Sequence, residues 1–366
     1  MPSPSAGFLW PSPILTERSK TLPSGKGITI WAPFRVDAGG TWDIKALALP
    51  YEDIDPVTLN IALKVGVEIK IEPFHNGLIK VESHYYPSLQ GPLEEVPFEG
   101  PLGLFAMCLR HFGLDNRKIS IKPDLPPGSS LGGSSAALVA LINGIVRLKD
   151  LPMDPVAIVT LAYHLEDIFQ MGGAGMQDHL AAQFGGVNLW HWHYSTYPFF
   201  SREVISEEGL ISEMEERILI AYTGSAHFSP GINKGFIKSF MEAKERNLWK
   251  EANAVVKELW QALKAEQWEE AAKFLNEETN IRARITKEAM DLGVFNSLIR
   301  KAKELGCGAR FTGAGGGGCV WAIGEKDKIQ ALKEIWKDLL EGIPGGRLIL
   351  SNIERKGIKT TEIIYE

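Results

Sequence analysis

The sequence has little cysteine and no long apolar stretch. Its 366 residues include only three cysteines, Cys108, Cys307 and Cys319, too few and too scattered for a disulfide framework or a zinc site. No stretch approaches the roughly 20 apolar residues that a membrane helix needs. Residues 1–25 are rich in proline and serine and lack the apolar core of a signal peptide. We therefore expect a cytoplasmic protein in a reducing compartment, with no membrane partner.

The sequence also lacks an excess of positive charge. The formal net charge is −6 and no basic stripe is visible, which argues against a nucleic-acid partner. A hydrophobic content of 45% and a charged content of 23% are typical of a globular protein. The length allows two domains, or one large domain with a substantial core.

Residues 126–137 contain neither of two common nucleotide-binding motifs, Gly-x-Gly-x-x-Gly and Gly-x-x-x-x-Gly-Lys-Ser/Thr. Residues 126–137, Pro-Pro-Gly-Ser-Ser-Leu-Gly-Gly-Ser-Ser-Ala-Ala, instead form a small-residue loop that leads into an apolar segment. Glycine lets the backbone approach a ligand, and the first N–H groups of a helix favour an anion. The hydroxyls of Ser134 and Ser135 add hydrogen bonds or a magnesium ligand. The loop predicts a phosphate site, although a plain helix cap by Ser129 or Ser130 has the same composition.

The first part of the chain reads as mixed α and β. Alternating or β-branched runs predict strands at 27–32, 65–72, 78–82, 118–122 and 187–192. The Asn76-Gly77 pair predicts a hairpin between the second and third of these strands. Helices are expected at 134–147, 155–169 and about 177–182. His191 and His193 lie on one face of the last strand. With no third ligand nearby, a polar strand face is favoured there over a metal site.

The character of the chain changes near residue 205, and we expect two domains, 1–205 and 206–366. Strands are predicted at 218–222, 309–311 and 319–323, with amphipathic helices from 234 through 300 and at 326–341. A second glycine-rich loop, Gly313 to Gly318, lies between the last two strands. No internal repeat occurs at a fixed period.

Three glycine-rich segments in this order resemble the motifs of a known family. Residues 32–43, 127–137 and 311–319 resemble the three motifs of the GHMP kinases, named for galactokinase, homoserine kinase, mevalonate kinase and phosphomevalonate kinase. Gly39-Gly40 before Asp43 resembles fucokinase and heptose 7-phosphate kinase, and residues 172–178 resemble the heptose kinase group. Arg35 resembles the arginine of galactokinase-like enzymes, so all three features indicate the sugar kinase branch. The resemblance implies an α+β, two-domain fold. Its N-terminal domain would be ribosomal protein S5 domain 2-like and its C-terminal domain ferredoxin-like.

The resemblance also implies an activity, the transfer of the γ-phosphate of ATP to a monosaccharide hydroxyl, with the anomeric 1-OH favoured. Asp178 matches the catalytic base and Arg35 the active-site arginine. Ser134 and Glu166 match the ligands of Mg2+, and Asp43 matches a carboxylate that binds sugar hydroxyls. Phosphoryl transfer needs mainly positioning and charge neutralisation, which such a set supplies.

The expected binding residues follow from the same match. The ATP loop comprises Pro127, Gly128, Ser129, Ser130, Leu131, Gly132, Gly133, Ser134 and Ser135. The substrate side comprises Asp43, Gly39, Gly40, Gly173, Gln177, Gly315 and Gly316. Residues 85–104 are expected to contribute to the adenine pocket. The implied partner is a small sugar molecule, and the protein is expected to be a monomer or a homodimer.

Each assigned residue also has a structural interpretation. Asp178 can be a helix cap, Glu166 a solvated helix residue and Asp43 a turn residue, while Arg35 can pair with Asp37 or Asp43.

The chain departs from the family motifs at three places. Phe34 and Ser130 replace glycines, and a positive φ at Ser130 would cost roughly 1 kcal/mol. Ser225-Ala226-His227 follow Tyr222-Thr223-Gly224 where heptose kinases tend to carry an arginine, which speaks against a phosphorylated sugar and leaves a neutral or an acidic monosaccharide open. The alternatives are a kinase of a small non-sugar alcohol and a non-catalytic binding member of the fold. The carboxylate of Asp43 discriminates, because a polyol needs it and an apolar chain does not.

Overall fold

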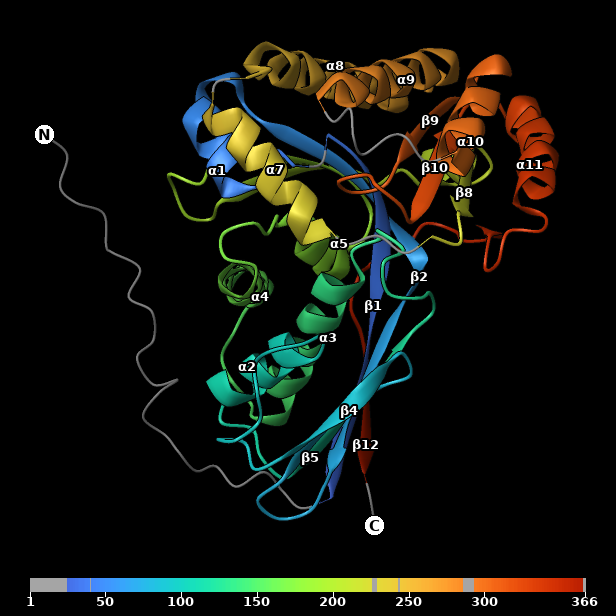
Figure 1. Cartoon of the computed structure of the whole chain (residues 1–366). Helices are drawn as coiled ribbons and strands as arrows, with labels where there is room; N and C mark the ends of the chain where they lie inside the picture. Colours follow the sequence, from blue (N-terminus) through green and yellow to red (C-terminus); the bar gives the residue numbers. More distant parts are fainter. Residues whose placement is uncertain (1–24, 40, 226–228, 243, 286–292, 365–366) are drawn as a thin grey trace, which may run out of the picture.

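Two β-sheets and the helices packed on them make up the fold (Figure 1). The computed structural model describes residues 25–39, 41–225, 229–242, 244–285 and 293–364. The strands are β1 (Lys26–Ala38), β2 (Val57–Pro73), β3 (Ile79–Ser83), β4 (Tyr86–Gly91), β5 (Arg117–Pro123), β6 (Val187–Trp192), β7 (Phe200–Ile205), β8 (Ile218–Tyr222), β9 (Gly308–Phe311), β10 (Cys319–Ile323), β11 (Arg347–Ile349) and β12 (Lys359–Ile364). The helices are α1 (Lys45–Ala48), the 3-10 helix η2 (Leu49–Ile54), α2 (Gly103–His111), α3 (Gly133–Leu148), α4 (Pro155–Phe169), α5 (Gln177–Phe184), α6 (Glu208–Glu215), α7 (Ser229–Met241), α8 (Arg246–Lys264), α9 (Trp268–Ile285), α10 (Gly293–Glu304) and α11 (Lys326–Leu340).

The first sheet is organised around the long strand β2. Its order is β12-β1-β2-β5-β3-β4, with β6 also paired to β2 and β7 paired to β6. Because β2 is 17 residues long, β6 pairs with its first part and β5 with its last part. β2 therefore pairs with different strands along its two halves.

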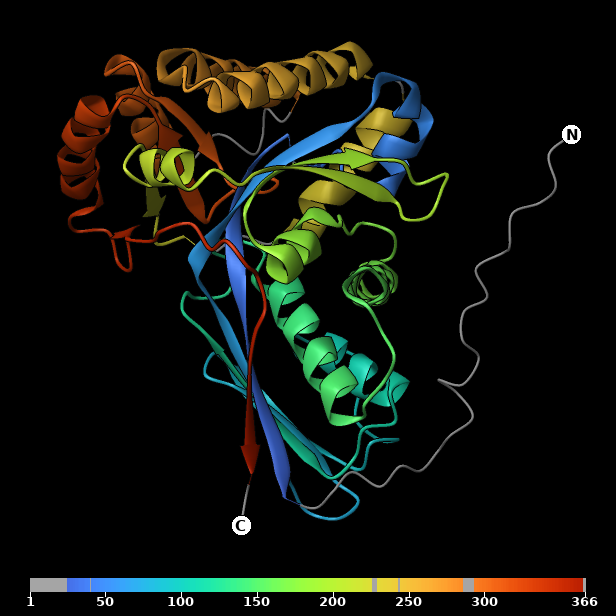
Figure 2. The same ribbon diagram turned by 180° about the vertical axis from the view of Figure 1, so that it is seen from behind.

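One face of this sheet is covered by helices. The apolar helix α3 packs on β1 and β2, and α2, α4 and α5 pack against α3 (Figures 1 and 2). Residues 135–146 of α3 are all buried. A helix with no polar face needs such an all-round covering, so α3 is a rigid support for the loop at its N-terminus.

The second sheet is smaller and antiparallel, in the order β11-β8-β10-β9. Helices α10 and α11 contact its strands, and α9 packs on β9 and β10. Helices α8 and α9 lie side by side, and α8 also contacts β2 (Figure 1). The helical pair α8–α9 therefore joins the two sheets.

The expected α+β, two-domain fold is confirmed by these two units. The division near residue 205 stays a prediction, and the last strand, β12, pairs with β1 in the first sheet. Among the described residues no helix is both long and apolar enough to cross a membrane.

The predicted hairpin between 65–72 and 78–82 is wrong. Strand β5 lies between β2 and β3, antiparallel to the first and parallel to the second. Asn116, just before β5, explains the wider connection. Its carbonyl accepts the N–H of Phe74 at 2.9 Å, and its side-chain Oδ1 accepts the N–H of Gly77 at 2.6 Å. The turn at Asn76-Gly77 therefore connects β2 to β3 across the beginning of β5, which lies between them.

Candidate active site

A cleft of about 830 Å³ contains most of the residues that the sequence singled out. One part of its lining is apolar and includes Val67, Pro101, Leu102, Leu104, Phe105, Ile121 and Leu125. The other part is polar and includes Arg35, Asp43, Gln177 and Asp178. The loop before α3 also lines the cleft, so a ligand with an apolar part and an anionic part matches it. Tyr86 and residues 100–102, within the segment expected near adenine, belong to the apolar part.

The loop before α3 presents its backbone to the cleft. Gly128 and Gly132 adopt left-handed φ values of 81° and 78°, which favour glycine. The N-cap of α3 is Gly132 and no side chain caps the helix, so the alternative of a cap by Ser129 or Ser130 is wrong. The first N–H groups of α3 thus have no intrahelical acceptor, which is the arrangement that binds an anion. Leu131 is buried in the core and does not line the cleft.

Ser130, which replaces a glycine of the family motif, adopts the positive φ that was considered for this position. Its φ is 61°, and its hydroxyl donates to the carbonyl of Gly317 at 3.2 Å. A Cβ at Gly318 would lie 2.6 Å from the Ser130 hydroxyl, so only glycine fits there. The loop before α3 and the loop at 313–318 are therefore in direct contact.

Asp178 lies beside this loop and is paired with Arg35. The Nε of Arg35 donates to Asp178 Oδ1 at 2.7 Å, and its Nη1 donates to the carbonyl of Ser130, also at 2.7 Å. A Cβ on Gly132 would come within 3.0 Å of the Asp178 carboxyl group. Burial raises the pKa of Asp178, and the charge of Arg35 opposes this. The N-cap of α5 is Met176, so the alternative of Asp178 as a helix cap is wrong.

Asp43 belongs to the polar part of the cleft lining. Its carboxylate accepts the N–H of Thr41 at 2.8 Å and the N–H of Gln177 at 3.1 Å. Asp43 is therefore a turn residue, as the structural interpretation predicted, and it also lines the cleft. Burial and the nearby Asp178 raise the pKa of Asp43 to about 6. Oε1 of Gln177, a residue only 4% exposed, has no hydrogen-bond partner among the described residues, which leaves an acceptor for a bound ligand.

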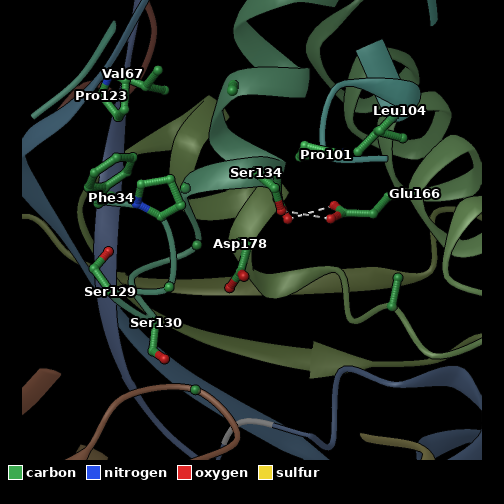
Figure 3. A pocket seen from close by; sticks show the side chains of 18 of the residues that line it. Phe34, Val67, Pro101, Leu104, Pro123, Ser129, Ser130, Ser134, Glu166 and Asp178 are labelled. Atoms are coloured by element: carbon green, nitrogen blue, oxygen red, sulfur yellow. Dashed lines mark hydrogen bonds between the residues drawn. The ribbon is translucent and has the colours of Figure 1, made fainter. Parts of the chain in front are cut away.

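Ser134 and Glu166 face each other from α3 and α4, close to Asp178 (Figure 3). The hydroxyls of Ser134 and Ser135 donate to the two oxygens of Glu166 at 3.0 and 2.6 Å, and His179 Nε2 lies 2.8 Å from Oε2. Burial alone would raise the pKa of Glu166, but His179 and the two hydroxyls keep it below its ordinary value. Glu166 is 2% exposed, so the alternative of a solvated helix residue is wrong.

The oxygen set of Ser134 and Glu166 fits Mg2+, which prefers hard oxygen ligands and keeps several waters. The Ser134 side chain is exposed to the cleft, and the carboxylate behind it is ionised. Among the described residues, no cluster of three or more histidine, cysteine, aspartate or glutamate side chains offers an alternative metal site.

Several predicted substrate residues lie outside the cleft lining. Gly39 packs against Val256 of α8, and an added Cβ would approach it to 2.8 Å. Gly173, Gly315 and Gly316 are also absent from the lining, whereas Gly313 and Ala314 belong to it. Gly40, Ala226 and His227 lie outside the described residues.

A buried set of charges missed by the sequence analysis lies behind Arg35. Asp37, Glu278 and Arg310 are completely buried, and Asp37 accepts the N–H of Gly313 at 2.7 Å. Arg35 Nη1 is 3.6 Å from Asp37 Oδ1, so the alternative pairing of Arg35 with Asp37 is confirmed. Arg35 makes this contact in addition to its contact with Asp178. The sequence named Asp37 as an alternative partner of Arg35, but no pattern in it placed Glu278 or Arg310 beside that pair.

His191 lies on β6 and His193 directly follows that strand, and neither belongs to a metal-binding cluster within the described part of the chain. His191 contacts Asp55 through Nδ1 at 2.8 Å and Glu203 through Nε2 at 3.2 Å. These contacts raise the pKa of His191, with the hydrogen bond to Asp55 as the largest cause. The favoured interpretation of a strand with a polar face agrees with this arrangement.

Comparisons with known proteins are consistent with this geometry. The family model of the GHMP kinases N terminal domain matches residues 102–186, and that of the GHMP kinases C terminal domain matches residues 259–342. A mevalonate kinase of Pyrococcus horikoshii is 25% identical over 339 residues, covering 82% of this chain and 90% of that protein. A D-glycero-alpha-D-manno-heptose 7-phosphate kinase of Campylobacter jejuni is 35% identical over 102 residues, 27% of this chain and 29% of that one. Among solved structures, Lactococcus lactis galactokinase complexed with galactose has a TM-score of 0.72 at 17% identity, covering 91% of this chain and 95% of that chain.

Proposed function

Because the chain belongs to the GHMP kinases, whose two domain models both match it, we propose that it is an ATP- and Mg2+-dependent kinase of a monosaccharide. The γ-phosphate would go to a sugar hydroxyl, with the anomeric 1-OH favoured. The observation that carries the proposal is the carboxylate of Asp178, which lies against Gly132 of the phosphate loop and 2.7 Å from Arg35.

Asp178 accepts the proton of the attacking hydroxyl in this proposal. Arg35 holds the Asp178 carboxylate in one orientation, and its positive charge offsets the negative charge of the phosphoryl group in transfer. The loop from Pro127 to Ser135 binds the phosphates through backbone N–H groups. The apolar part of the cleft holds the base of the nucleotide.

Ser134 and Glu166 would hold the magnesium ion, which supplies charge neutralisation at the phosphates when bound. In the structure the hydroxyl of Ser134 donates to Glu166, so metal binding requires that hydroxyl to turn its oxygen toward the ion. Ser135 and His179 keep the Glu166 carboxylate in place from behind.

The charge balance of the polar part favours an uncharged acceptor. Among the described residues of the lining, Arg35 is the one cation, beside the carboxylates of Asp43, Glu166 and Asp178. Its guanidinium is already bonded to Asp178 and to the carbonyl of Ser130. Asp43 and Gln177 offer acceptors for hydroxyl protons, which are abundant on a sugar.

The second candidate is an acceptor like mevalonate, which carries a carboxylate and one reacting hydroxyl. The similarity to the Pyrococcus horikoshii mevalonate kinase over most of the chain favours it. Its carboxylate would need a free cation, and Arg35 is engaged. The two candidates therefore make opposite predictions about the charge of the acceptor.

The test is a panel of free monosaccharides, sugar phosphates and mevalonate, with ATP and Mg2+ and a readout of ADP release. NMR of the product then locates the new phosphate. ADP release that depends on a free sugar supports the proposal, whereas turnover of mevalonate alone would replace it with the second candidate. ATP binding with no acceptor turned over would indicate a non-catalytic member of the fold.

The compartment and assembly are also proposals. The three cysteines are free and buried, which fits the reducing cytoplasm. A monomer or homodimer stays a prediction, to be checked by light scattering.

A further inference from the structure

A buried chain of alternating charges runs from α9 to Asp178. Glu278 of α9 accepts Arg310 Nε at 2.6 Å, and Arg310 Nη1 lies 3.2 Å from Asp37 Oδ2. Asp37 Oδ1 is 3.6 Å from Arg35 Nη1, and Arg35 Nε is 2.7 Å from Asp178 Oδ1. The side chains of Glu278, Arg310 and Asp37 are 0% exposed and that of Arg35 is 5% exposed, whereas that of Asp178 is 21% exposed and faces the cleft.

This chain connects segments that belong to different parts of the fold. Asp37 and Arg35 are on β1 of the first sheet, Arg310 is on β9 of the second, and Glu278 is on the helix that packs on β9. Asp37 also accepts the N–H of Gly313, which begins the glycine-rich loop at 313–318 and lines the cleft. Glu278 accepts the N–H of Gly39, in the segment that leads to Asp43.

We propose that Glu278 and Arg310 are positioning residues for the reaction, which hold Asp37 so that Arg35 keeps its place against Asp178. Neither residue touches the cleft, so both act only through their neighbours. The inference rests on the proposed function in that Asp178 is taken as the catalytic base. Buried ion pairs of this kind add little net stability, because desolvation offsets their attraction, so a role in orientation accounts better for their presence.

The direction of coupling follows from the order of the charges. Without the charge of Glu278, Arg310 pairs more strongly with Asp37. Asp37 then attracts Arg35 less, so the ion pair between Arg35 and Asp178 becomes stronger. Without the charge of Arg310, Asp37 instead draws Arg35 away from Asp178. The first change lowers the pKa of Asp178 and the second raises it.

Asp178 has further charged neighbours that both changes leave in place. These are Asp43 in the loop after β1 and His179 on α5, with Glu166 of α4 behind His179. Since they are common to all variants, a difference between the variants reports the chain through Arg35.

The experiment is a carbon-13 NMR titration of the aspartate carboxyl groups in the full-length protein, without substrate, with Asp178 assigned through Asp178→Asn. The variants are Glu278→Gln and Arg310→Gln, with Arg310→Lys as the charge-conserving variant. Thr279→Val is the matched control, since Thr279 is the buried neighbour of Glu278 on α9 and its change removes a hydroxyl but no charge.

We expect opposite shifts of the Asp178 pKa in Glu278→Gln and Arg310→Gln, and none in Thr279→Val or Arg310→Lys. Equal shifts in Glu278→Gln and Thr279→Val, or shifts of the same sign in the two charge variants, would overturn the proposal. If Arg310→Gln does not fold, the comparison of Glu278→Gln with Thr279→Val still decides. The titration needs no turnover, so a failure of the proposed kinase function would appear separately, as absence of ADP release in the wild type.

Discussion

Replacing Gly175 by alanine should remove the sugar-binding role of Asp43 without changing Asp43 itself. A Cβ at Gly175 would lie 1.9 Å from Asp43 Oδ2 and 2.4 Å from its Cγ, far inside van der Waals contact. Gly175 has no positive φ in the structure, so the backbone conformation accepts alanine, and the three atoms nearest to the added Cβ all belong to the Asp43 carboxylate. Asp43 must therefore move.

The cost of this movement can be worked out from the bonds that fix the carboxylate. Asp43 accepts the N–H groups of Thr41 and Gln177 at 2.8 and 3.1 Å in a buried setting. A hydrogen bond to a charged group contributes about 1.5–3 kcal/mol, so losing one bond lowers the free energy of unfolding by about that amount. The loss of the carboxylate's bonds to sugar hydroxyls should lower kcat/KM for the sugar by roughly 10- to 100-fold.

The assay is steady-state ADP release with the sugar identified by the panel, together with urea unfolding of both proteins. Gly209→Ala is the matched control, because Gly209 lies in α6 and a Cβ there meets nothing within 4 Å. The control should keep the kcat/KM of the wild type. A Gly175→Ala enzyme with kcat/KM within about twofold of the wild type would refute the role of Asp43 in sugar binding.

Three further predictions concern Ser130, Asp43 and His191. Ser130→Ala keeps the strained left-handed φ but loses the hydrogen bond to Gly317, so urea unfolding should show a free energy of unfolding lower by about 1 kcal/mol. Ser130→Gly loses the same bond but also relieves about 1 kcal/mol of strain, so its stability should be near that of the wild type. Equal losses of stability in the two variants would contradict the strain argument. The pKa of Asp43 is about 6, so the KM for the sugar should rise as the pH falls through about 6 and the carboxylate is protonated, and a KM that is flat with pH in the wild type would argue against this contact. The raised pKa of His191 gives a contribution to folding that is full below the ordinary histidine value and is lost as the pH rises through the raised value. His191→Gln should therefore destabilise the protein at pH 5.5 by on the order of 1 kcal/mol and less at pH 8, and an equal effect at both values would refute the ion pairs with Asp55 and Glu203.

Local patterns in the sequence predicted many of the elements near the site. The strand at 187–192 and the helix at 155–169 are confirmed with the same bounds, because alternation and helix-terminal residues are local signals. The small-residue loop before α3 was equally readable, since a backbone site needs glycine at fixed positions. The predicted hairpin at Asn76-Gly77 is wrong because a turn signal does not indicate whether a later strand lies between the two strands that the turn connects.

The residues behind the site could not be predicted from the sequence. Asp37, Glu278 and Arg310 are brought together by a strand of one sheet, a strand of the other and the helix that packs on it. A lone aspartate or arginine in a strand is usually solvated, and only the paired sheets bury these charges together. Glu166 illustrates the same limit, since a glutamate in a helix looks solvated until His179 and two serines surround it.

The central claim is that this chain transfers phosphate from ATP to an uncharged sugar with Asp178 as the base. The most direct measurement is single-turnover transfer from γ-labelled ATP to the sugar, in the wild type and in Asp178→Asn, with ATP binding measured in both. The account predicts labelled sugar phosphate from the wild type, and ATP binding with transfer reduced at least about a hundredfold in the variant. Unchanged transfer in Asp178→Asn, or label found on mevalonate and on no sugar, would contradict it.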